Sequence, residues 1–233
     1  ELQWRRFATG LYEPLGLKVI DGKVHVVGRD RITRLHDENR DGGADFYESF
    51  HAFDHVSNGY HAFTFGSDTD SQGNIYAVKS GRKTDYPIPG AVLKISPDGK
   101  SSEVIGTGFR HPNGMTVGPG DRVFVSDNQG GWMPASKVSH VRDNRFYGYI
   151  GWEHNTVDRD TFQQPVFWLP HEVDDSSGGQ AWMTDERWGP LAGNIIHTSY
   201  GAGRVFYVLL QEIDDELQAA VVPFPWKFSS GTM

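Results

Sequence analysis

A segment of this sequence recurs about every fifty residues, and the repeat constrains the possible fold more than any other feature. GLYEPLGLKVIDGKVHVV (Gly10 to Val27) and GFRHPNGMTVGPGDRVFVS (Gly108 to Ser126) share one order of glycine, proline, glycine, strand, glycine turn and second strand. Looser copies are HAFTFGSDTDSQGNIYAV (His61 to Val78) and GGQAWMT (Gly178 to Thr184). Such a period is typical of β-propellers, in which each repeat forms one blade of four strands.

Each copy is followed by a further segment with strand character: RITRL (Arg31 to Leu35), GAVLKI (Gly90 to Ile95), SKVSHV (Ser136 to Val141) and GRVFYVLL (Gly203 to Leu210). The alternation in KVHVV and RVFVS fits sheets that bury a face against the next blade. No linker divides residues 1–233, so we predict one all-β domain, a β-propeller with about four to five visible blades. A ring closes only when its last blade meets its first, so we expect a fragment of a larger protein or an unusual closure.

The charge balance and the lack of cysteine exclude several functions. There are 30 acidic and 22 basic side chains, and the net charge of -8 argues against a nucleic-acid-binding surface. The chain has no cysteine, so disulfides, thiolate metal sites and covalent c-type haem attachment are excluded. We expect no membrane span, because no apolar run is long enough to cross a bilayer.

The stretch HDENRDGGADFYE (His36 to Glu48) has the spacing of a calcium-binding loop. An EF-hand needs a helix on each side of its loop, whereas the flanking stretches RDRITRL and FYESFHAF have strand character. The sequence therefore predicts a calcium loop on a β-hairpin, and the alternative is a solvated turn. The candidate ligands are Asp37, Asn39, Asp41, Gly43 through its carbonyl, Asp45 and Glu48.

Three stretches resemble a known group of proteins: residues 11–48, residues 108–136 and SSGGQAWMTDERWGPLAGNIIHTSYGAGRVFYV (Ser176 to Val208). They are similar to sugar dehydrogenase-like β-propellers, relatives of the quinoprotein glucose and sorbosone dehydrogenases. The members from planctomycetes and allied bacteria are most similar, and many of those carry a separate haem domain. The resemblance thus implies a six-bladed type of propeller and a cytochrome or haem domain as partner.

In characterised members of that group, pyrroloquinoline quinone (PQQ) lies over the propeller axis with calcium beneath it. A histidine takes the proton of the sugar hydroxyl while hydride passes to the quinone. The resemblance implies that His61 is this base and that Arg110 contacts the cofactor. His111, beside it, stands where the group has asparagine. The backbone around Asp127 and Gly130 falls where the group places its cofactor calcium.

The loop DNQGGWMP (residues 127–134) supplies two more candidate cofactor-binding residues, Asn128 and Trp132. Amide oxygens can hold a cation, and an aromatic face suits the C–H surface of a sugar ring. The alternative is a packed corner between blades. For His61 and Arg110 the corresponding alternatives are a polar residue at the inner rim and an arginine that ties a loop to the next blade.

A second polar cluster lies in LPHEVDDSSGGQ, where His171, Glu172, Asp174 and Asp175 fall within five positions. Such a set can hold a metal, and the alternative is an exposed charged loop.

These observations give a hypothesis and its rivals. We expect a periplasmic or extracellular PQQ-dependent sugar or alcohol dehydrogenase that also binds Ca²⁺. The first rival is a non-catalytic, calcium-binding propeller that binds a glycan or a protein partner, or forms part of a surface assembly. The second is a lactonase-like hydrolase with a central calcium. Fold alone does not decide among them, because function resides in the site.

Overall fold

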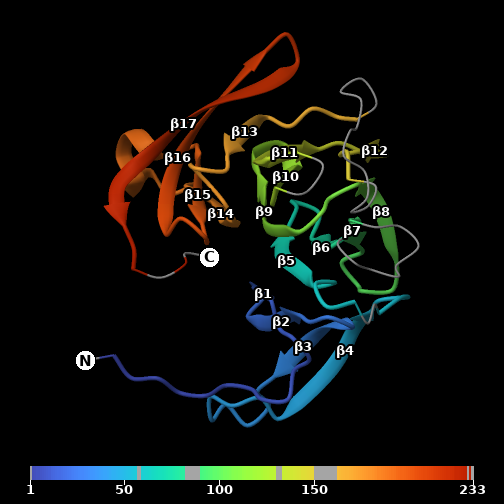
Figure 1. The fold of residues 1–233 in the computed structure, drawn as a ribbon. Helices are drawn as coiled ribbons and strands as arrows, with labels where there is room; N and C mark the ends of the chain where they lie inside the picture. Colours follow the sequence, from blue (N-terminus) through green and yellow to red (C-terminus); the bar gives the residue numbers. More distant parts are fainter. Residues whose placement is uncertain are drawn as a thin grey trace.

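The structure is a computed structural model that describes residues 2–56, 59–81, 90–129, 133–149, 162–229 and 231. Four sheets are arranged about a common centre (Figure 1). Consecutive strands within each sheet pair mainly antiparallel, which is the pattern of propeller blades. The predicted all-β propeller fold is confirmed, with four blades in the described part of the chain. Among these residues no helix is both long and apolar enough to cross a membrane.

The blades follow one another along the chain. Blade 1 contains β1 (Gly16–Ile20), β2 (Lys23–Val27), β3 (Arg31–His36) and β4 (Phe46–Ala52); blade 2 contains β5 (Thr64–Thr69), β6 (Ile75–Lys79), β7 (Val92–Ile95) and β8 (Ser102–Thr107). Blade 3 contains β9 (Pro112–Gly118), β10 (Arg122–Asp127), β11 (Ala135–Val141) and β13 (Phe167–Pro170); blade 4 contains β14 (Ser177–Trp182), β15 (Ile195–Ser199), β16 (Arg204–Ile213) and β17 (Glu216–Lys227). Strand β12 (Arg145–Phe146) adds a short parallel pairing to β8, and η1 (Pro119–Asp121) and η3 (Glu186–Leu191) are short 3-10 helices.

The first strand of each blade is innermost, and these strands touch one another through glycines. A Cβ added to Gly16 would lie 1.6 Å from the carbonyl oxygen of Gly66, and one added to Gly114 would lie 2.1 Å from that of Gly178. On the other side, a Cβ at Gly66 would lie 2.0 Å from the sulfur of Met115. The repeated glycine is therefore required because the inner strands of adjacent blades approach too closely to admit a Cβ.

We expect Gly16→Ala to lower the free energy of unfolding by about 1–3 kcal/mol, because the new methyl group forces blades 1 and 2 apart. Gly22→Ala is the comparison: Gly22 lies in a turn with φ +73° and has open space around it. That change costs only backbone strain, about 1 kcal/mol. Urea titration of both variants shows which of them loses more unfolding free energy. Equal losses would contradict the close approach of the inner strands.

Apolar side chains between neighbouring blades form the core. One cluster joins blades 1 and 2, a second joins blades 2 and 3, and a third joins blades 3 and 4. Their central members are Val27, Ile32 and Ile75 in the first, Phe65, Val92 and Val125 in the second, and Phe124, Val138 and Ile195 in the third. Each blade is thus held mainly by the face that it buries against its neighbour.

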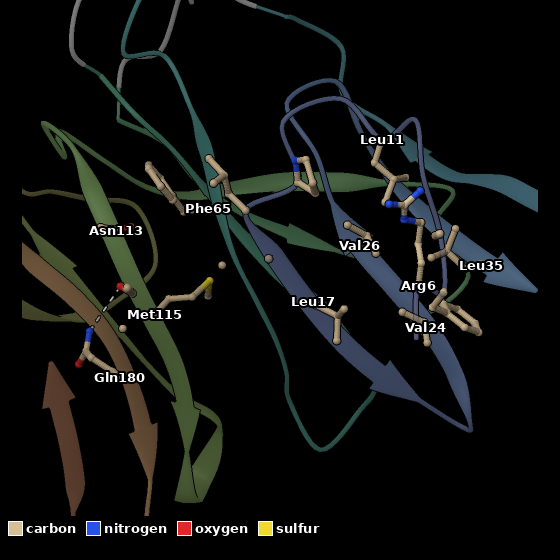
Figure 2. Close-up of a pocket in the computed structure, with 18 residues that line it drawn as sticks. Arg6, Leu11, Leu17, Val24, Val26, Leu35, Phe65, Asn113, Met115 and Gln180 are labelled. Atoms are coloured by element: carbon tan, nitrogen blue, oxygen red, sulfur yellow. Dashed lines mark hydrogen bonds between the residues drawn. The ribbon is translucent and has the colours of Figure 1, made fainter. Parts of the chain in front are cut away.

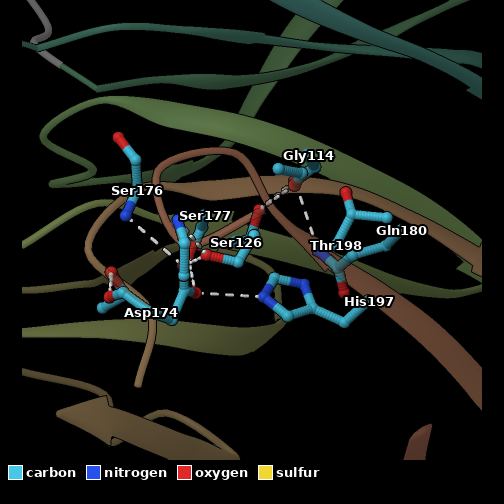
Figure 3. A network of polar contacts seen from close by, with 12 residues as sticks. Gly114, Ser126, Asp174, Ser176, Ser177, Gln180, His197 and Thr198 are labelled. Atoms are coloured by element: carbon cyan, nitrogen blue, oxygen red, sulfur yellow. Dashed lines mark hydrogen bonds and ion pairs between the residues drawn. The ribbon is translucent and has the colours of Figure 1, made fainter. Parts of the chain in front are cut away.

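A buried polar network stabilises blade 4 at its border with blade 3 (Figure 3). The Asp174 carboxylate accepts hydrogen bonds from the Ser177 hydroxyl at 2.7 Å and the Ser199 hydroxyl at 2.6 Å, and it lies 3.1 Å from His197 Nε2. All four side chains belong to fully buried residues. Asp174 therefore stabilises the fold from a buried position, whereas His171 and Glu172 of the same stretch are exposed.

Candidate active site at the propeller axis

Four of the predicted site residues line one cavity, although they come from separate parts of the sequence. This axial cavity, of about 510 Å³, is lined by His61, Arg110, His111 and Asn128 together with Leu15, Phe63, Phe65, Asn113, Gln129, Ser176 and Tyr200. His61 precedes β5, Arg110 and His111 precede β9, and Asn128 follows β10. Loops that precede the inner strands β5 and β9, and the loop after β10, therefore build the cavity, which is why a propeller repeat brings them together. Trp132 and Gly130 lie outside the described residues.

Asp127 fixes the backbone of the loop that carries the arginine and the histidine. Its carboxylate accepts hydrogen bonds from the Arg110 N–H at 2.9 Å and from the His111 N–H at 2.7 Å. Lys137 Nζ lies 3.6 Å from the same carboxylate, and neither side chain is more than 2% exposed. Burial raises the pKa of Asp127 and lowers that of Lys137 to about 8. The Asp127 side chain is thus committed to positioning this loop, whereas the sequence predicted a cation-binding role for Asp127.

The Arg110 guanidinium supplies the positive charge of the cavity wall. It donates a hydrogen bond to the carbonyl of Gln129, and the residue is only 7% exposed. A partly dehydrated guanidinium is a strong partner for a carboxylate, because its planar N–H groups match the two oxygens.

Two imidazoles line the cavity beside two phenylalanine rings. The His61 and His111 ring centroids are 5.4 Å apart, and the His111 ring packs edge-on against Phe65 at 5.5 Å. Phe63 contacts both histidines. Histidine is the side chain that takes up and releases protons near neutral pH, so the pair can exchange protons with a ligand in this cavity.

Two amide oxygens at the cavity are buried without a hydrogen-bond partner among the described residues: Asn128 Oδ1 and Gln129 Oε1. A buried acceptor without a partner is costly, so such atoms commonly mark a place where a ligand or water donates. Both can accept hydrogen bonds from hydroxyl groups of a bound molecule. Asn128 was predicted from the sequence as a cofactor-binding residue, and Gln129 belongs to the same predicted loop.

The predicted calcium loop connects β3 and β4, so the expected hairpin scaffold is present. Backbone N–H groups bind its carboxylates: Asp37 accepts from Asp41 N at 3.1 Å, and Asp45 accepts from Glu38 N at 2.8 Å. Asn39 also donates to Asp45 Oδ1 at 3.0 Å. These oxygen-bearing side chains gather in the loop, which suits a hard cation in chemical type.

Glu48 lies apart from that group. Its carboxylate faces β3 and lies 2.8 Å from His36 Nε2 and 3.3 Å from Arg34 Nη1. The hydrogen bond with His36 lowers its pKa. Gly43 donates its N–H to Asp41. In the described ranges no group of three or more histidine, aspartate or glutamate side chains is arranged to hold a metal ion.

Calcium binding by this loop stays a prediction with a direct test. We expect calorimetric titration to show one Ca²⁺ site that is lost in Asp37→Asn, because that change removes a charged oxygen donor from the loop. Asp54→Asn, at an exposed position elsewhere, serves as the control. Unchanged calcium binding by the Asp37 variant would contradict the loop assignment.

A second, apolar cavity of about 780 Å³ adjoins the axial one, and sequence reasoning did not predict it. Figure 2 shows Asn113, Met115 and Gln180 on one side and Val24, Val26 and Leu35 on the other. The two cavities share Leu15, Phe65 and Asn113. A third cavity, of about 520 Å³, brings together His171, Glu172 and Asp175 of the second polar cluster with Arg204 and Lys227.

Comparison with known proteins supports the fold. No protein-family model matches the sequence, and no curated protein sequence matches it. Two solved glucose dehydrogenase structures superpose with TM-scores of 0.71 and 0.72 at 12% identity; the matches cover 94% and 92% of this chain and 74% of each of those chains. A putative oxidoreductase (glucose dehydrogenase) from Thermus thermophilus has a TM-score of 0.53 at 14% identity, covering 95% of this chain and 86% of that one. The chain therefore shares the fold of sugar dehydrogenase propellers.

Proposed function

We propose that this chain is a PQQ-dependent sugar or alcohol dehydrogenase that uses the axial cavity as its active site. The observation that carries the proposal is the convergence of His61, Arg110, His111 and Asn128 on one cavity. A dehydrogenase of this kind needs a cation for the acidic cofactor, a base for the substrate hydroxyl and hydrogen-bond partners for the sugar. The cavity contains each of these.

The residues of the cavity fit PQQ in chemical type, since this cofactor is a planar ring system that carries carboxylates. The Arg110 guanidinium would bind a carboxylate, and Phe63 and Tyr200 offer aromatic faces to a flat ring. When bound, PQQ supplies the two-electron oxidant that accepts hydride from the substrate carbon.

The protein contributes orientation and proton transfer. An imidazole of the His61–His111 pair accepts the proton of the substrate hydroxyl. The amide oxygens of Asn128 and Gln129 accept hydrogen bonds from other hydroxyl groups of a sugar. Asp127 keeps Arg110 and His111 at fixed positions relative to one another, so the charged and basic groups act on the same bound molecule.

Reconstitution tests the proposal. The purified chain is mixed with PQQ and Ca²⁺, and dye reduction is followed with a panel of aldoses and simple alcohols. We expect saturable PQQ binding and dye reduction with at least one substrate. An absence of PQQ binding together with an absence of dye reduction would contradict the proposal, and retained calcium or glycan binding in that case would favour the non-catalytic propeller.

A further inference from the structure

The hydroxyl of Ser80, at the end of β6, connects blade 2 to the loop that carries the site residues of blade 3. Its oxygen lies 3.0 Å from the Arg110 carbonyl, to which it donates a hydrogen bond, and 3.1 Å from His111 Nδ1. Ser80 is only 2% exposed, and its own N–H donates to the carbonyl of Phe63 at 2.9 Å. The hydroxyl is therefore held in place from two sides.

This arrangement determines which nitrogen of His111 carries the proton. A serine hydroxyl has a single hydrogen, and here the Arg110 carbonyl receives it. The hydroxyl can then only accept a hydrogen bond from His111, so Nδ1 must carry the hydrogen of the neutral imidazole. Nε2 is left as the basic nitrogen.

His111 is held both at its backbone and at its ring. Its backbone N–H is bound by Asp127 at 2.7 Å, and its ring nitrogen is bound by Ser80. A base that a third group orients in this way is the arrangement found in activated catalytic sites. After protonation, Nδ1–H still donates to Ser80, so the same contact suits both charge states of the ring.

We propose that His111, held by Ser80 in the Nδ1–H form, is the proton acceptor of the axial cavity, and that Ser80 is its positioning residue. This inference rests on the proposed dehydrogenase function. The substrate hydroxyl gives its proton to Nε2 of His111. A bound quinone would supply the two-electron oxidant that takes up the hydride of the same carbon, so that the alcohol would become a carbonyl compound. His61, whose ring lies 5.4 Å away, is the neighbouring imidazole and not the base.

The first test needs no cofactor and no activity. Long-range proton–nitrogen NMR of histidine-labelled protein, at a pH where His111 is neutral, reports which ring nitrogen is protonated, and His111→Asn assigns its signals. We expect the Nδ1–H form in the unmodified chain, loss of this preference in Ser80→Ala, and its retention in Ser80→Thr, which keeps the hydroxyl. An Nε2–H form of His111 in the unmodified chain would overturn the inference, whether or not the protein oxidises any sugar.

The second test compares the two imidazoles in the reconstituted protein. We expect His111→Asn to lower the single-turnover rate about 100-fold or more and to remove its pH dependence near neutrality. His61→Asn lowers the rate less and retains that dependence. The reverse order of the two variants would overturn the assignment of His111 while leaving the dehydrogenase function in place. An Nδ1–H form without oxidation of any alcohol would instead refute the dehydrogenase function, and the base role with it.

Discussion

Replacing Asp174 with alanine lowers the free energy of unfolding by about 3–5 kcal/mol, one of the two largest effects that we expect. The change removes a buried carboxylate that binds Ser177, Ser199 and His197. Those groups lose their partner inside the protein, where water cannot replace it. Urea titration followed by tryptophan fluorescence measures the loss. Asp54→Ala, at an exposed position, is the control and leaves the unfolding midpoint unchanged.

The same carboxylate makes stability depend on pH in the acid range. Burial alone raises its pKa, but the hydrogen bonds from His197, Ser199 and Ser177 outweigh burial, so the pKa is lowered on folding. A lowered pKa stabilises the fold above the unfolded value of about 4, and this contribution is lost as the pH falls below it. Asp174→Asn should therefore be less stable than the unmodified chain at pH 7, with a smaller difference at pH 3. A constant difference across this range would contradict the ionised state of Asp174.

Breaking the buried pair of Asp127 and Lys137 is the second large effect that we expect. Asp127→Asn and Lys137→Met should each lower the free energy of unfolding by about 3–5 kcal/mol, because each leaves a charge buried without its partner. The double variant should lose less than the sum of the two, since it leaves neither charge behind. Additive losses would contradict the direct interaction.

An exposed pair of the same two residue types serves as control. Lys100 Nζ lies 3.4 Å from Asp98, but both side chains are largely exposed. Water and salt screen such a pair, so the corresponding substitutions should show almost no coupling. The two ion pairs have similar separations, so a difference between their coupling energies reports the effect of burial. Asp127→Asn should also weaken ligand binding in the axial cavity, since it loosens the backbone of Arg110 and His111.

Much of the fold can be predicted from the sequence because each blade repeats the same requirement for a glycine on its inner strand. Gly16, Gly66 and Gly114 leave no room for a Cβ where two inner strands touch, and Gly178 lies opposite Gly114, so the glycine recurs with the blade. The strands can be recognised by their alternating apolar residues, and turn glycines separate one strand from the next. A local pattern repeated in this way predicts a global arrangement, because all copies meet at the same axis.

The candidate site could be predicted only in part. His61, Arg110, His111 and Asn128 were found because each lies in a recognisable stretch next to a strand of the repeat, and the repeat places such positions on one cavity. Ser80 was missed, because no motif marks a serine at the end of β6 and its contact with His111 exists only between blades. The role of the Asp127 carboxylate was missed for the same reason: its partner Lys137 lies on another strand.

Nor could the side-chain contacts of the predicted calcium loop be inferred from the sequence. The spacing places Glu48 as the last ligand of the calcium-loop pattern. On a β-strand, however, successive side chains alternate between faces, and pairing with β3 puts Glu48 beside Arg34 and His36. Spacing on a helix and spacing on a hairpin therefore predict different neighbours for the same residue.

Titration with PQQ, followed by its absorbance and by tryptophan fluorescence, tests the central claim that residues of separate blades form one ligand site. We predict one saturable site, weakened about 10-fold to 100-fold in Arg110→Met, because one charge-assisted interaction of about 1.5–3 kcal/mol is lost. Arg187→Met, at an exposed position paired with Asp185, should bind like the unmodified chain. No saturable binding, or equal binding by both variants, would contradict a ligand site built around Arg110.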